Sequence, residues 1–132
     1  MLENKYNSED LQDIGFYLRG LLQVMAADNH LHEKEKNKIK KYAESMGFEK
    51  EYIEKTIQNL LENKHMPRMP DQFHSKKTAE TFLKEAIQMA VCDGILHPLE
   101  QKWLLRAAKK NEIDEQYVLN LMEKVLQQDK KL

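Results

Sequence analysis

Two short segments of the sequence carry an aspartate, a histidine and a glutamate at the same spacing, and corresponding residues are 65 positions apart. The six residues are Asp28, His32, Glu35, Asp93, His97 and Glu100. Carboxylate and imidazole groups together are a plausible ligand set for a divalent metal ion. Each segment supplies at most three ligands, so tight binding would require both segments to meet at one place. One interpretation is therefore a shared divalent-metal site formed by these six side chains.

The same segments also have a purely structural interpretation as turns between helices. The run His97-Pro98-Leu99-Glu100 is typical of a helix start, with proline first and glutamate at the third helical position. Glu35 has the equivalent place in the first segment. Gly94 and Asn29 suit the end of the preceding helix, where a positive φ is needed. In this interpretation the repeated residues only shape the fold.

The match between the two segments extends over most of the chain without a gap. Apolar residues recur 65 positions apart in the pairs Leu18 and Leu83, Leu22 and Ile87, Ile39 and Leu104, Ala43 and Ala108, Phe48 and Ile113, and Ile53 and Val118. Self-similarity at a fixed period indicates a duplicated structural unit. We predict two copies, at about residues 8–63 and 73–128, with a linker at 64–74 in which Pro67 and Pro70 prevent a continuous helix.

Each copy is expected to contain three helices. Apolar residues at helical spacing predict helices at about 8–27, 33–46, 49–63, 75–92 and 98–110, and a sixth after Asp114. Ser8, Ser75 and Asp114 are candidate N-caps, and Gly47 is suited to the end of the second helix. Two glycines inside the first helix, Gly15 and Gly20, are expected where another helix approaches closely. We expect Tyr52, Leu99, Trp103 and Tyr117 on the apolar stripes of their helices.

These elements predict an all-α fold, a single helical domain over residues 1–132 made of two pseudo-symmetric three-helix repeats. Apolar residues make up 41% of the chain and charged residues 33%, as expected for a helical protein. The formal net charge of −1 gives no reason to expect nucleic-acid binding. No apolar run reaches the roughly 20 residues that span a bilayer, no signal peptide is recognisable, and a single cysteine fits a reducing cytoplasm.

The turn pattern D-G-x-L-x-x-x-E, present as Asp93-Gly94-Ile95-Leu96-His97-Pro98-Leu99-Glu100 and echoed from Asp28 to Glu35, resembles the TerB-like group. This group includes tellurite-resistance proteins and the N-terminal domain of a DnaJ-like co-chaperone. The resemblance covers about residues 8–128 and implies a cytoplasmic all-α fold with an acidic cluster suspected of binding metal. It also implies a link to tellurite or metal stress responses. Asp28, Glu35, Asp93 and Glu100 match the acidic positions of the family.

Three functions remain open at this stage. The first is a TerB-like module that binds a divalent metal ion through the twin turns, and the second is a protein-interaction domain in which those turns are structural. The third, a metal-dependent hydrolase, needs an open metal position and a nearby base. We expect no enzyme activity, because no nucleophile elbow or phosphate-binding glycine loop is found. A protein partner is expected. The shared metal site further predicts that Asp28 and Asp93 lie near a common point.

Overall fold

A computed structural model of the chain describes residues 8–27, 33–62, 69–91 and 95–130. Within these ranges the chain forms six helices and no strand. The helices are α1 (Ser8–Met25), α2 (Glu33–Ser45), α3 (Lys50–Glu62), α4 (Lys76–Ala90), α5 (Pro98–Lys110) and α6 (Glu115–Lys130). The predicted all-α class is confirmed, the first five helices begin and end within two residues of their predicted bounds, and α6 begins directly after Asp114 as predicted.

Local capping residues determine where α4 and α6 begin. The Ser75 hydroxyl accepts a hydrogen bond of 3.3 Å from the Thr78 backbone N–H, and Asp114 Oδ1 accepts one of 3.1 Å from the Gln116 backbone N–H. Each bond satisfies one of the amides that a helix leaves unpaired in its first turn. Both predicted N-caps are therefore confirmed.

The ends of α2 and α5 have the same backbone geometry. The Phe48 N–H bonds to the Ala43 carbonyl at 3.1 Å, and the Ile113 N–H bonds to the Ala108 carbonyl at 2.8 Å. A residue with positive φ precedes each of these amides: Gly47 with φ 97° after α2, and Glu112 with φ 57° after α5. This is the Schellman arrangement, and the two examples lie 65 residues apart.

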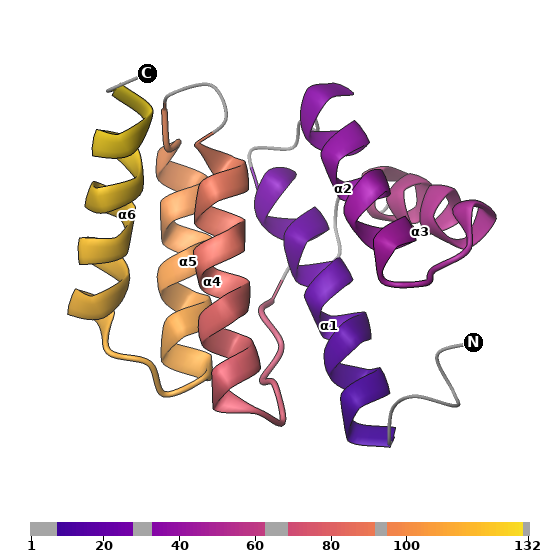
Figure 1. The fold of residues 1–132 in the computed structure, drawn as a ribbon, viewed down its shortest axis with the longest axis horizontal. Coiled ribbons are helices and arrows are strands. Elements are labelled where there is room, and N and C mark those ends of the chain that lie inside the picture. Colours follow the sequence, from indigo (N-terminus) through magenta and orange to yellow (C-terminus); the bar gives the residue numbers. More distant parts are fainter. Residues whose placement is uncertain (1–7, 28–32, 63–68, 92–94, 131–132) are drawn as a thin grey trace.

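Helices α1 and α4 lie side by side in the middle of the molecule and run in the same direction (Figure 1). Helices α2 and α3 lie on the α1 side, and α5 and α6 lie on the α4 side. Contacts also cross between the halves, because α1 touches α5 and α2 touches α4. The buried side chains form one cluster to which both halves contribute, including Leu18, Leu22, Ile39 and Ile53 from the first half and Leu83, Ile87, Leu104 and Val118 from the second.

The two glycines of α1 have different surroundings. A Cβ atom at Gly20 would lie 2.7 Å from Cζ of Phe82 and 3.5 Å from the Trp103 ring, so the predicted close approach is confirmed there. A Cβ atom at Gly15 would meet no described atom within 4 Å, and the same prediction is wrong for that residue. Gly20 is therefore required by packing against α4 and α5, whereas Gly15 only lowers the helix propensity of α1.

This difference predicts opposite effects of the same substitution. Gly15→Ala should raise the free energy of unfolding by about 0.5–1 kcal/mol, because alanine favours a helix interior and meets no obstacle. Gly20→Ala should lower it by about 1–2 kcal/mol, because the buried Phe82 ring must move away from the new methyl group. Urea denaturation of the two variants checks both signs, and a stabilising Gly20→Ala would contradict the packing seen here.

Three residues that are expected on apolar stripes are instead about half exposed to solvent. Tyr52 is 53% exposed, Leu99 is 50% exposed and Tyr117 is 47% exposed. In α5 the buried face is formed by residues 100, 103, 104, 107 and 108, and position 99 falls outside this arc. Trp103, by contrast, is only 5% exposed and belongs to the core as predicted. The predicted inward orientation is thus wrong for Leu99, and the two tyrosines expected on apolar stripes are about half exposed.

Residues 69–75, at the C-terminal end of the linker, contribute to the hydrophobic core. Phe73 is buried, and its ring centroid lies 5.3 Å from that of Phe82 and 6.2 Å from that of Tyr17. The preceding Asp71 makes an ion pair of 2.9 Å with Arg19 of α1. Residues 69–75 therefore pack against α1 and α4, which a description as a simple linker does not capture.

Candidate functional site

The start of α5 shows what the repeated glutamate does in the second turn. Glu100 is 3% exposed, and its Oε1 accepts a hydrogen bond of 3.2 Å from the backbone N–H of His97. His97 is the N-cap residue, with φ −68° and ψ 146°, and Pro98 follows at the first helical position. Glu100 therefore satisfies the amide of the cap residue, as the structural interpretation of the turn predicts.

Glu35 is the corresponding residue of α2. It is 5% exposed and is the third residue of its helix, as Glu100 is in α5. Glutamate is seldom this buried unless its carboxylate is paired. Two residues 65 positions apart thus place a buried acidic side chain at the third position of their helices.

The predicted metal ligands can be compared with the structure only in part. Asp28, His32 and Asp93 lie outside the described residues, whereas Glu35, His97 and Glu100 lie inside them. Among the residues that the structure describes, no group of three or more His, Cys, Asp or Glu side chains could hold a metal ion. Oε1 of Glu100, one of the three described residues of the set, already accepts the hydrogen bond from the His97 backbone.

The direction of the helices bears on whether the two turns are neighbours. Helices α1 and α4 contact each other, and Figure 1 shows that their C-terminal ends lie at the same end of the molecule. Each of these ends leads into one of the two acidic segments. The predicted meeting of Asp28 and Asp93 concerns residues outside the described ranges and stays a prediction.

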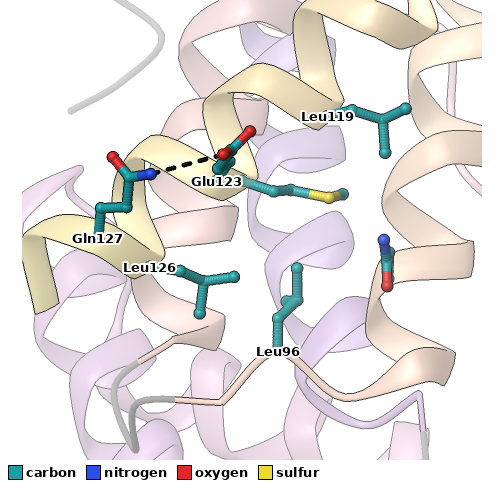
Figure 2. A pocket seen from close by; sticks show the side chains of 7 residues that line it. Leu96, Leu119, Glu123, Leu126 and Gln127 are labelled. Carbon is teal, nitrogen blue, oxygen red and sulfur yellow. Dashed lines mark hydrogen bonds between the residues drawn. The ribbon is translucent and has the colours of Figure 1, made fainter. Parts of the chain in front are cut away.

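A groove between α5 and α6 is a different candidate, which the sequence analysis missed. It has a volume of 390 Å³ and is lined by Leu96, Gln101, Leu119, Met122, Glu123, Leu126 and Gln127. Figure 2 shows Leu96 rising from the segment before α5 towards the α6 side chains Leu119 and Leu126. Pockets of a few hundred Å³ with apolar walls and a few polar groups are typical binding sites.

Glu123 is the only charged residue among those that line this groove. Its carboxylate accepts a hydrogen bond of 3.4 Å from Gln127 on the next turn of α6, as Figure 2 shows. The ion pairs found among the described residues do not involve Glu123. The groove therefore combines apolar walls with one exposed negative charge.

The first half of the chain has a groove at the corresponding place, between α2 and α3. Its lining residues are Lys36, Lys40, Glu54, Ile57 and Gln58, and its volume is 290 Å³. Four of these five residues are 65 positions before lining residues of the α5/α6 groove. The walls differ in chemistry, because Lys40 and Glu54 approach to 4.0 Å across the first groove, where the second copy has leucines.

A third hollow lies between α4 and α6 and has both polar and apolar lining residues. It measures 400 Å³, and five of its eight lining residues are lysine, glutamine or asparagine, including Lys84 and Lys124. Tyr117, Leu121 and Val125 supply its apolar surface. Unlike the α5/α6 groove, this hollow has no acidic side chain among its lining residues.

A cluster of titratable groups joins α1, α2 and α4 in the core. The Tyr17 hydroxyl donates a hydrogen bond of 2.6 Å to Glu85, and the Tyr17 and Tyr42 rings stack with centroids 5.4 Å apart. Burial, followed by the bond to Glu85, raises the pKa of Tyr17, and burial raises the pKa of Tyr42 to about 12. Both phenols therefore stay protonated at neutral pH, and Tyr17 acts as a hydrogen-bond donor, not as a base or nucleophile.

Comparisons with protein-family models, with curated proteins and with solved structures find no match for this chain. The resemblance to the TerB-like group therefore stays a prediction. None of the helices in the described ranges has both the length and the hydropathy that are needed to cross a membrane.

Proposed function

We propose that this chain is a TerB-like, cytoplasmic protein-interaction domain whose partner binds in the α5/α6 groove. The observation that carries the proposal is the apolar wall of that groove, formed by Leu96, Leu119, Met122 and Leu126 beside one charged residue. The equivalent α2/α3 groove has two lysines and a glutamate instead. One scaffold thus presents two similar hollows, one lined mainly by apolar residues and the other mainly by charged residues.

The proposal includes two pseudo-symmetric three-helix repeats. In its support, α2 and α5 begin and end 65 residues apart, and so do the starts of α3 and α6. The cross-contacts are reciprocal as well, since α1 touches α5 and α2 touches α4. A two-fold axis between α1 and α4 would produce this pattern. The repeated turns would then be structural, in keeping with the bond between Glu100 and the His97 backbone.

Photo-crosslinking tests the interaction site. Gln127 is exposed at the edge of the α5/α6 groove. A photoreactive amino acid at this position should crosslink the chain to one discrete partner protein in cells that produce it. Position 62 is the matched control, because it occupies the same place in the first copy. The crosslink should disappear with Leu119→Glu, which installs the residue found at position 54. Identical products from positions 127 and 62 would rule out this groove as the binding site.

Divalent-cation binding by the twin turns is a second candidate function. It is supported by the burial of Glu35 and Glu100 at matching helical positions and by the common direction of α1 and α4. Such a site also needs Asp28 and Asp93, which lie outside the described residues. It would be a binding site, with no catalytic role assigned to it.

Glu100→Gln separates this candidate from the capping role. Glutamine can still accept the His97 N–H bond, so the melting temperature without metal should change little. If the turns bind a cation, Mn²⁺ or Ca²⁺ should raise the melting temperature of the parent chain but not that of the variant. Glu115→Gln removes an exposed charge elsewhere and serves as the control. A parent chain whose melting temperature is unchanged by the ions would leave the turns with a structural role only.

A further inference from the structure

We infer that the α5/α6 groove binds an amphipathic helix of another protein, with apolar side chains between Leu96, Leu119 and Leu126 and a lysine or arginine beside Glu123. This inference rests on the proposed function and specifies the chemistry of the partner. It follows from the shape of the wall, from its single charge, and from its difference from the α2/α3 groove.

The spacing of the wall fits a helix. Leu119 and Leu126 are seven residues apart on α6, and Met122 lies between them. At 1.5 Å per residue, this is a wall of about 10 Å, or two helical turns. An amphipathic helix presents apolar side chains at positions i, i+3 or i+4, and i+7 over the same length, which is the usual pattern of helix-in-groove recognition.

The charge of the wall selects a basic partner. Glu123 is exposed, is the only charged lining residue, and has Gln127 as its hydrogen-bond donor at 3.4 Å. A carboxylate beside an apolar surface attracts a lysine or arginine and repels aspartate or glutamate, and so it sets the orientation and identity of the ligand more than its affinity.

The α2/α3 groove, in the first half of the chain, lacks this preference for a basic partner. Two lysines and one glutamate give the α2/α3 lining a formal charge of +1, whereas the α5/α6 lining carries −1. Gln58 stands where the second copy has Glu123. The two grooves therefore differ in the sign of their charge and in the number of apolar side chains that line them, and the α5/α6 groove is the better match to a basic amphipathic helix.

Two synthetic peptides can test this inference with the full chain. One is a fluorescein-labelled helical 16-residue peptide of leucine, alanine and lysine with leucines at i, i+3 and i+7, and the other has every lysine replaced by glutamate. Fluorescence anisotropy should show that the lysine peptide binds about tenfold more tightly than the glutamate peptide, a ratio that corresponds to about 1.4 kcal/mol. Glu123→Lys should reverse this preference. Gln58→Lys adds one positive charge to the other groove, against a change of two at Glu123, and should leave the preference intact.

The outcomes separate the partner chemistry from the proposed function. Glutamate peptide that binds as tightly as lysine peptide, and causes NMR shifts at Leu96, Leu119 and Leu126, would overturn the basic partner but keep the groove as an interaction site. Equal effects of Glu123→Lys and Gln58→Lys would also overturn the inference. Failure of both peptides to bind, together with no crosslink from position 127, would overturn the proposed function too. A dimer in sedimentation that Leu119→Glu converts to monomer would make a second copy the occupant instead.

Discussion

Replacing Asn111 by alanine should lower the free energy of unfolding by about 3 kcal/mol, because one side chain joins α5 to the 69–75 segment. Asn111 is buried after the last turn of α5. Its Oδ1 accepts a hydrogen bond of 2.8 Å from the Phe73 N–H, and its Nδ2 donates to the Asp71 carbonyl at 3.1 Å and the Ala107 carbonyl at 2.9 Å. Alanine would leave the buried Phe73 amide without this acceptor.

Urea denaturation measures this loss, and hydrogen exchange at the Phe73 amide locates it. Asn120→Ala is the matched control, because Asn120 is exposed on α6 and bonds only to the nearby Gln116 among the described residues. The control should stay within about 0.5 kcal/mol of the parent. An Asn111→Ala variant that loses less than about 1 kcal/mol would show that the other contacts of the 69–75 segment, those of the Phe73 ring and those with Arg19 and Asp13, hold it without Asn111.

The helices could be predicted because the residues that begin and end them are close in sequence. Asp114 is two residues from the amide that it caps, and Ser75 is three residues from its partner. The Glu100 bond to His97 also spans three residues. Signals of this length are visible in a sequence without knowledge of its tertiary structure, which is why the bounds of α5 were predicted without error.

The 69–75 segment could not be predicted in the same way, because its partners are distant in sequence. Phe73 bonds to a residue 38 positions away, and His74 bonds to one 61 positions away. The sequence around Asn111 and Asp13 contains no pattern that predicts their bonds to the 69–75 segment. The exposure of Leu99 has a related cause, since only the packing against neighbouring helices decides how wide an apolar stripe is.

The candidate groove was missed for a different reason. Most of its residues belong to the amphipathic pattern of α6, which is ordinary for a helix on a protein surface. The pattern that would have indicated the groove is the set of positions, 65 residues apart, at which the residue types differ. Lys36, Lys40, Glu54 and Gln58 become Gln101, Leu105, Leu119 and Glu123 in the second copy. Alignment of the copies emphasised the residues that they share, and those are the residues that build the fold. Positions at which the copies differ are the better place to look for a function carried by one of them.

Replacing Asp13 by alanine should lower the free energy of unfolding by about 2–3 kcal/mol, because this buried carboxylate of α1 holds the beginning of α4. Its Oδ1 accepts a hydrogen bond of 2.8 Å from the His74 N–H, and its Oδ2 accepts one of 3.1 Å from the Ser75 N–H. Both amides lie just before α4, where the helix dipole also favours a negative charge.

Two further variants separate this effect from ordinary helix capping. Ser75→Ala removes only the bond to the Thr78 amide and should cost about 1 kcal/mol. Asp13→Asn keeps one acceptor oxygen, so its loss should fall between those of Ser75→Ala and Asp13→Ala. Hydrogen exchange should accelerate at His74 and Ser75 in Asp13→Ala, but mainly at Thr78 in Ser75→Ala. If Asp13→Ala loses no more stability than Ser75→Ala, the Asp13 carboxylate does not hold the beginning of α4 against α1.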